Sequence, residues 1–155
     1  MFRKMRRIDK AMDEAAALEL LKKCEYGIIS TVGSDDYPYG VPVNYAYKDG
    51  FIYFHCATTG HKLDNIKENN KVSFCAVGES KIISEKFSTK YESVIIFGKA
   101  SIVDDDEKKE ALLEIIKKYS PDFIESGKKY IESDFDKTLV VKIEIEHMTG
   151  KKAKE

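Results

Sequence analysis

The sequence has no apolar run near the roughly 18 residues that a membrane-spanning helix requires. The opening MFRKMRRIDK is basic and lacks the apolar stretch of a secretory signal peptide. A net charge of −1 over 155 residues argues against a nucleic-acid binder that depends on positive potential. We therefore predict one soluble, cytoplasmic domain over residues 1–155 that binds neither membrane nor nucleic acid, with a basic arm at 1–10 and a polar tail at 148–155.

Cysteine and histidine are also scarce, with three of each. Cys24, Cys56 and Cys75 are widely spaced, and no CxxC pair or Cys/His cluster of zinc-site spacing is present. We expect free, buried thiols in a reducing compartment and no metal site. The GxSxG elbow, the Walker loop, GxGxxG and HExxH are missing as well, which removes the usual sequence signatures of several large enzyme classes.

The most informative stretch that is present is GFIYFHCATTGHKLDNIKENNKVSF, residues 50–74. It predicts a strand at Phe51–Cys56, a turn at Ala57–Gly60, a helix that opens at His61 and Lys62, and a second strand from Lys71. The free N–H groups and the dipole of a helix start favour an anion, and a lysine adds a compact charge with three donors. We interpret this stretch as a phosphate pocket; a surface helix start with ordinary basic residues is the alternative.

The flanking sequence predicts a mainly β, α+β barrel of about six antiparallel strands with flanking helices. Pro42 indicates an edge strand, a bulge or a point where the backbone turns away, and Gly98 indicates a bulge or bend. We expect a long polar connection over 79–89, with a short strand at Lys81–Ser84 as an alternative within it. The expected strands are 26–32, 39–47, 51–56, 71–78, 91–103 and 138–147, and the expected helices are 13–24, 104–119 and 122–132, the last burying Phe123, Ile124, Tyr130 and Ile131.

Two polar residues in apolar strands have alternative interpretations. His55, within IYFHC, is either a satisfied core or rim residue or a neutral donor or acceptor beside a cofactor ring. Asn44 either reads the edge of a ring with its amide or forms a hydrogen bond with the backbone.

Taken together, these residues resemble the pyridoxamine 5'-phosphate oxidase-like flavoproteins with the FMN-binding split barrel, and within them the nitroimidazole-reductase (Nim-type) branch. The resemblance is carried by Pro42-Val43 ahead of an Asp-Gly turn, "IYFHCA" followed by "GHKLD", "NNKVSF" after the helix, and "VIIFGKA" further on. It extends over about residues 5–150 and is densest at 37–100.

The resemblance implies a six-stranded antiparallel split β-barrel and a homodimer with two FMN sites at the subunit interface. By position, the resemblance places the strand residues Val41, Pro42, Val43 and Asn44 along the isoalloxazine ring. It places His55, Cys56 and Ala57 beside the ring and the ribityl chain, and His61 and Lys62 on the phosphate. It implies that Ser93 contacts the cofactor across the subunit interface.

The chain also departs from the oxidases. His61 stands where they place an arginine before the phosphate lysine, and the C-terminal TLVVKIEIEHMTGKKAKE lacks their Trp and Arg–Leu–His stretch. Pyridoxamine phosphate is therefore not the expected substrate.

The leading hypothesis is an FMN-dependent oxidoreductase that reduces a small aromatic or nitro-type acceptor, with His55 as the side chain closest to the chemistry. A non-catalytic flavin or cofactor-binding module, such as a carrier or sensor, is the alternative on the same fold. A small β-barrel interaction protein whose GHK turn only begins a helix is the third hypothesis. A deazaflavin or haem in place of FMN is also left open at this stage.

Overall fold

Two helices begin at aspartate side chains, as the sequence predicts. In the computed structural model, which describes residues 1–154, α1 spans Glu14–Lys23 and α3 spans Asp105–Tyr119. The carboxylate of Asp13 accepts a hydrogen bond from the Ala16 N–H at 2.7 Å, and that of Asp104 accepts one from the Glu107 N–H at 2.9 Å. Each cap satisfies one of the donors that a helix start leaves free.

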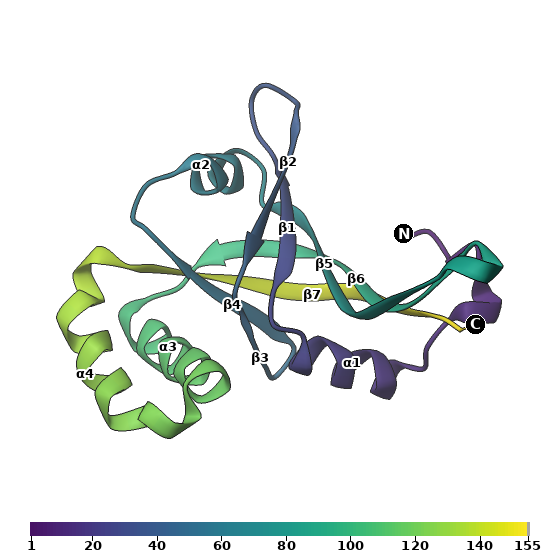
Figure 1. Cartoon of the computed structure of the whole chain (residues 1–155). Coiled ribbons are helices and arrows are strands. Elements are labelled where there is room, and N and C mark those ends of the chain that lie inside the picture. Colours follow the sequence, from purple (N-terminus) through teal and green to yellow (C-terminus); the bar gives the residue numbers. More distant parts are fainter. Residues whose placement is uncertain (155) are drawn as a thin grey trace.

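A seven-stranded antiparallel sheet forms the body of the molecule (Figure 1). Its order is β2-β1-β5-β6-β7-β4-β3, so β6 is the central strand and has three strands on each side. The strands are β1 Gly27–Val32, β2 Pro38–Val43, β3 Ala46–Lys48, β4 Phe51–Cys56, β5 Lys71–Ile83, β6 Ser88–Ile102 and β7 Leu139–Ala153; the remaining helices are α2 His61–Glu68 and α4 Ile124–Asp134.

The expected count of six strands is wrong, because the single strand predicted over 39–47 is two strands on opposite edges of the sheet. The backbone leaves the ladder at Asn44 and Tyr45. The Tyr119 hydroxyl donates to the Tyr45 carbonyl and accepts from the Tyr45 N–H, both at 3.0 Å. A side chain from α3 therefore satisfies the backbone that a strand neighbour would otherwise satisfy. With two residues between β2 and β3, the sheet curls until its edges meet, which gives the expected split-barrel class.

Three local predictions in this region are confirmed. β2 is an edge strand that pairs with β1 alone, and an edge strand is one of the places where a sheet accommodates a proline such as Pro42. Asp49 and Gly50 join β3 to β4 with positive φ angles of 51° and 92°, as an Asp-Gly hairpin turn requires. Gly98 lies at a shift in the β6–β7 register, where a Cβ atom would meet the Glu144 carbonyl oxygen at 2.2 Å.

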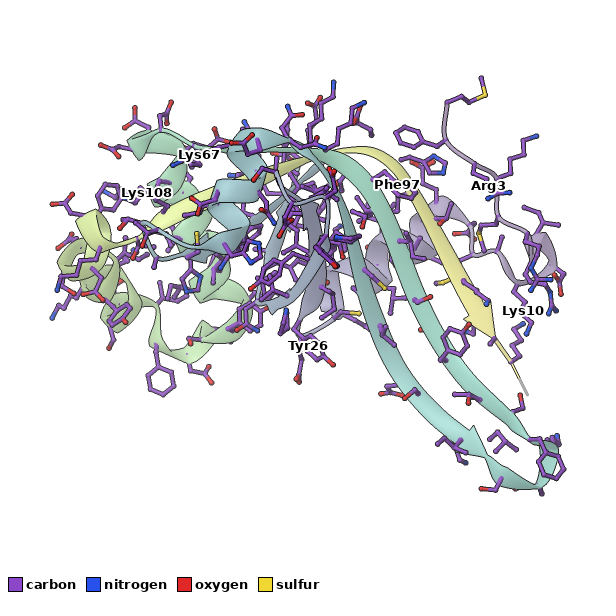
Figure 2. The ribbon with its side chains drawn as sticks, turned by 90° about the horizontal axis from the view of Figure 1, so that it is seen from above. Arg3, Lys10, Tyr26, Lys67, Phe97 and Lys108 are labelled. Carbon is purple, nitrogen blue, oxygen red and sulfur yellow. The ribbon has the colours of Figure 1, made fainter. Side chains whose placement is uncertain are left out.

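The β5–β6 hairpin is longer than predicted. The segment expected as a polar connection over 79–89 continues the ladder through the pair Ile83–Ser88, and a 3₁₀ turn at Ser84–Lys86 closes it. Figure 2 shows this ribbon reaching away from the end of the molecule that carries Lys67 and Lys108. Polar residues are compatible with a strand here because both faces of the ribbon meet solvent.

The last strand is also longer than predicted. β7 continues past His147 to Ala153, through most of the segment expected as a polar tail, because it pairs with β6 as far as Tyr91. Glu155, at the end of that expected tail, lies outside the described residues. In the expected basic arm, Ile8–Lys10 form a 3₁₀ turn and Phe2 stacks on the rings of Phe97 and His147, with centroids 5.5 and 5.0 Å apart.

Two hydrophobic clusters hold the sheet. The first fills the inside of the curl, where α1 covers one side and residues such as Phe54, Phe74 and Ile96 are fully buried. The second lies on the outer face, where α3 and α4 cover Tyr53 and Val140. Ile131 belongs to this cluster, as predicted.

The other expectations for the helical pair and the cysteines have mixed outcomes. Phe123 and Tyr130 are exposed, so their predicted burial is wrong. All three cysteines are free; Cys24 is buried, whereas Cys56 and Cys75 are half-buried. Among residues 1–154, no helix is long and apolar enough to cross a membrane.

Candidate functional site

The start of α2 differs from the starts of α1 and α3 because no side chain caps it. Its N-cap is Gly60, and the first turn carries His61 and Lys62 together with the acidic Asp64. The N–H groups of this turn are therefore free to donate to a ligand, and the helix dipole adds partial positive charge. The feature predicted from the sequence as an anion pocket is thus an uncapped, basic helix start.

A buried hydrogen bond fixes the position of α2 on the sheet. The Asn65 side-chain amide donates to the Thr31 hydroxyl of β1 at 3.0 Å, and both residues are almost fully buried. Gly33 lies against the same amide, and a Cβ atom there would come within 2.0 Å of the Asn65 Oδ1. Because a satisfied buried pair tolerates little displacement, α2 holds His61 and Lys62 at a defined place beside β1 and β2.

Tyr39 of β2 packs against His61, with ring centroids 4.0 Å apart. The contact joins the edge strand to the start of α2 and limits how His61 can turn. Sequence reasoning missed Tyr39. An aromatic residue two positions before Val41 was the only local signal, and the contact itself depends on how the sheet curls.

The end of β4 brings His55 and Cys56 close to Lys62. Burial lowers the pKa of His55, and the charge of Lys62 lowers it further. Burial raises the pKa of the Cys56 thiol, which the same lysine partly offsets. His55 nevertheless presents much of its side chain to solvent. Near neutral pH the site therefore has an imidazole and a thiol that are both uncharged, beside one ammonium group.

The strand predicted to lie along a cofactor ring is the sheet edge. The side chains of Val41 and Val43 lean on the inner core, while Pro42 is exposed on the opposite face, directly across from Ile28. Ala57 is exposed and follows the end of β4. This edge offers an apolar surface without backbone donors at Pro42, which suits contact with a flat, apolar ring.

Asn44 and Ser93 lie apart from this group. The Asn44 amide donates to the Glu25 carbonyl at 2.9 Å, the backbone alternative considered for it, and borders a cavity of about 490 Å³ with Lys118 and Tyr119. Ser93 lies on the outer face of β6, between Val77 of β5 and Lys151 of β7. One chain therefore brings together the β2, β4 and α2 residues, but not Ser93.

The assembled residues form a cationic end with free N–H donors, neutral polar groups next to it and an apolar edge beyond. A phosphate-bearing molecule with a flat apolar part fits this sequence of surfaces. Among the described residues, no cluster of three or more His, Cys, Asp or Glu side chains could hold a metal ion.

This fold and site define a class of antiparallel split-barrel proteins. A model of the family described as pyridoxamine 5'-phosphate oxidase matches residues 13–152, nearly the whole chain. The chain belongs to that family. No curated protein sequence matches it.

Solved structures share the fold at low sequence identity. A candidate 5-nitroimidazole antibiotic resistance protein from Bacteroides thetaiotaomicron is 23% identical, with a TM-score of 0.74 over 91% of this chain and 85% of that one. The flavocytochrome Anf3 from Azotobacter vinelandii is 16% identical, with a TM-score of 0.83 over 99% and 73%. An FAD- and haem-binding protein from Mycobacterium smegmatis is 17% identical, with a TM-score of 0.82 over 94% and 74%.

Proposed function

We propose that this protein is an FMN-dependent oxidoreductase that reduces a small aromatic or nitro-type acceptor. The observation that carries the proposal is the uncapped, basic start of α2 beside the end of β4, within a chain of the pyridoxamine 5'-phosphate oxidase family. The similar structures described as a flavocytochrome and as an FAD- and haem-binding protein support a flavin as the cofactor. The likeness to a candidate nitroimidazole resistance protein supports the class of acceptor.

The residues of the site fit FMN in three zones. His61, Lys62 and the free N–H groups of α2 would hold the phosphate, because charge-assisted hydrogen bonds to a dianion are strong. Cys56 and Ala57 would lie beside the ribityl chain. The edge formed by Val41, Pro42 and Val43 would lie along the ring, whereas Asn44, which was expected there, is held by the Glu25 carbonyl.

A bound flavin would accept electrons from a reduced donor and pass them to the acceptor. The protein would supply position and electrostatics. His55 is held neutral by its surroundings, so it can donate or accept a hydrogen bond near the ring without adding charge. Lys62 would balance the charge of the phosphate.

We also propose that the protein is a homodimer with FMN at the subunit interface. Apolar side chains of β5 and β6, including Val77 and Ile95, are exposed on the outer face of the sheet, around Ser93. A second copy that packs on this face would bury them and bring its Ser93 toward the first copy's cofactor. Sedimentation of the purified protein tests the dimer.

Two lysines of α2 provide a matched test of the phosphate contact. Lys62 is in the first turn, and Lys67 is exposed in the last turn of the same helix. We expect Lys62→Ala to weaken FMN binding by about 1.5–3 kcal/mol, since it removes one charge-assisted contact. Lys67→Ala removes the same charge and should leave the affinity within about 0.5 kcal/mol. Isothermal titration with FMN measures both.

A yellow chromophore in the purified protein, or a rise in melting temperature with added FMN, is the first expected result. Absence of both overturns the proposal. Equal losses in the two lysine variants would contradict the phosphate contact, because long-range charge alone would then explain them.

A non-catalytic flavin-binding module is the second candidate function. It is favoured because none of the side-chain hydrogen bonds found among residues 1–154 orients His55, so no protein group fixes it for a proton transfer. Oxidation of NAD(P)H with a nitroaromatic acceptor separates the two. Bound FMN without turnover supports the module, and turnover supports the reductase.

A further inference from the structure

The chain crosses from one edge of the sheet to the other in two residues, Asn44 and Tyr45. β2 ends at Val43 and pairs only with β1, whereas β3 begins at Ala46 and pairs only with β4. Neither residue of this crossover belongs to a strand, so no ladder fixes where the chain makes the step. The place where β2 ends therefore depends on the groups that hold the crossover.

Two consecutive side chains at the end of α3 hold the backbone of the crossover. The Tyr119 hydroxyl oxygen lies 3.0 Å from the nitrogen and 3.0 Å from the carbonyl oxygen of Tyr45, and 2.7 Å from the Glu25 carbonyl oxygen. A hydroxyl has one proton, so it donates to only one of these two carbonyls at a time. The Lys118 amine also donates to the Tyr45 carbonyl, at 3.0 Å, so this carbonyl keeps a donor when the hydroxyl turns to Glu25.

Tyr45 is fully buried, which makes the loss of any of these contacts costly. Its hydroxyl donates to the Leu21 carbonyl of α1, and its ring meets Phe74 edge to face with centroids 4.9 Å apart. A backbone group of a buried residue has little access to water, so it pays the cost of desolvation when its partner is removed. The crossover is therefore joined to α1 through Leu21 and to α3 through Tyr119, and it has little freedom to shift.

The same contacts lie next to the first pair of the β1–β2 ladder. The Glu25 carbonyl, which lies within hydrogen-bond distance of the Tyr119 hydroxyl, also accepts the Asn44 side-chain amide at 2.9 Å. The pair Gly27–Val43 begins the ladder beside them. A slip of one residue would turn each side chain of β2 to the opposite face of the sheet. The contacts at Glu25 oppose such a slip, because they fix the chain at the point where the pairing starts.

β2 connects the crossover to both ends of the candidate site. Its last residue, Val43, borders the crossover and belongs to the edge proposed to lie along the flavin ring. Nearer the other end of the strand, Tyr39 packs on His61 at the start of α2, with ring centroids 4.0 Å apart. α2 is held separately on the sheet by the buried hydrogen bond between Asn65 and Thr31. A change at the crossover should therefore move the ring edge more than the phosphate end.

We propose that Tyr119 is a positioning residue of the flavin site, and that its hydroxyl sets the register and position of β2 against the isoalloxazine ring. The inference rests on the proposed flavin function and deepens it. Tyr119 acts through the crossover, so it has no need to touch the flavin or the acceptor. Lys118 supports it by satisfying the Tyr45 carbonyl, and Asn44 anchors the strand in place of reading the ring.

Tyr119→Phe tests the effect on the flavin, because it removes the hydroxyl and keeps the ring. We expect the Kd for FMN to stay within about threefold, since the residues proposed to bind the phosphate are unchanged. The visible circular dichroism and the midpoint potential of the bound flavin should both shift, because they depend on what surrounds the isoalloxazine ring.

Tyr130→Phe is the matched control, since Tyr130 is exposed on α4 and removes the same hydroxyl group. This variant should match the natural chain in affinity, dichroism and potential. If bound FMN has the natural dichroism and potential in Tyr119→Phe, or if the two variants shift equally, the proposal is overturned.

Amide hydrogen exchange tests the hold on β2 without any flavin. In the full chain without FMN, we expect Tyr119→Phe to speed exchange at the backbone amides of β1 and β2 by at least about tenfold, while the β6–β7 ladder stays within about threefold. Lys118→Met keeps the hydroxyl and removes only the second donor to Tyr45, so it should give a smaller rise in the same strands and serves if Tyr119→Phe does not fold.

The pattern of exchange separates the possible outcomes. Natural exchange in β1 and β2, or a uniform rise across the whole sheet, overturns the proposal, because Tyr119 would then add only to overall stability. If FMN never binds but exchange rises selectively in β1 and β2, the proposed function fails and the role of Tyr119 in placing β2 stands.

Discussion

The outer face of the sheet has two regions that differ in what covers them. Over β4 and β7, α3 and α4 bury Tyr53 and Val140. Over β5 and β6, residues on the same face, such as Val77 and Ile95, are left exposed within one chain. Figure 1 shows the two helices gathered at one end of the sheet, away from the β5–β6 ribbon.

This difference shows which face of the sheet the proposed second copy would cover. The covered region is completed by its own chain and can contribute to the stability of a monomer. The uncovered region leaves Val77 and Ile95 exposed within one chain, and the proposed second copy would bury them. The candidate site residues follow the same division, since the β4 and α2 residues come together in one chain while Ser93 lies on the uncovered face.

The largest expected effect contrasts the two regions directly. Ile131 of α4 is buried against Val140, and Ile95 of β6 is nearly half exposed. Ile131→Ala should lower the free energy of unfolding by about 2–4 kcal/mol, because it leaves a cavity. Ile95→Ala should change it by less than about 1 kcal/mol in the monomer. Urea unfolding at a protein concentration below dimerisation measures both, and equal losses would contradict the division.

The next effect concerns the joint between the regions. Gly98 lies where the β6–β7 register shifts, and a Cβ atom there would meet the Glu144 carbonyl oxygen at 2.2 Å. Gly98→Ala should cost about 1–3 kcal/mol, because the backbone of β7 has to move. Gly40→Ala on the edge strand is the control. Its Cβ would have ordinary contacts at 3.4 Å, so thermal unfolding should show almost no change.

The smallest effect is a dependence on pH in the covered region. Burial lowers the pKa of Lys118 to about 8, from its usual 10.5. The Lys118 amine donates to the Tyr45 carbonyl at 3.0 Å and lies 3.8 Å from the centre of the Tyr45 aromatic ring. Between these two pH values the unfolded chain binds more protons than the folded one, so stability rises with pH.

We expect this lysine to add about 1 kcal/mol of stability between pH 7.5 and 9.5, after allowance for partial solvent screening. The measurement is the slope of unfolding free energy with pH, compared between the natural chain and Lys118→Met, since the raised pKa values of the thiols act in the opposite direction in both. Lys117→Met, at the exposed neighbour, should keep the natural slope. Identical slopes in all three would show that Lys118 does not titrate in this range.

Local signals predicted most of the elements and half of the site. Asp13 and Asp104 mark helix starts, Asp-Gly marks the β3–β4 turn, and the aromatic and apolar run FIYF marks β4. The same stretch placed His61 and Lys62 at the start of α2, because a Gly before a His-Lys pair is a local pattern.

Other features depended on contacts between distant residues. The break at Asn44 and Tyr45 has no clear local signal, because the groups that bind these residues are distant in sequence. The Glu25 carbonyl accepts from the Asn44 side chain, and the Tyr119 hydroxyl binds the Tyr45 backbone. The polar residues of the β5–β6 ribbon suggested a connection. Both faces of the ribbon meet solvent, so its sequence lacks the alternation of apolar and polar residues that marks a half-buried strand. The contact of Tyr39 with His61 arises only when the sheet curls.

The sequence by itself determined where helices and strands begin, because caps, turns and alternation act over a few residues. It also determined the chemistry of the α2 start, since Gly60, His61 and Lys62 are consecutive. Only the tertiary structure decided which strands became edges, where the backbone left the ladder and which apolar face lacked a cover. These depend on long-range packing, which no short stretch of residues encodes. They place the start of α2, where we propose that a phosphate binds, beside the end of β4 and the edge strand β2.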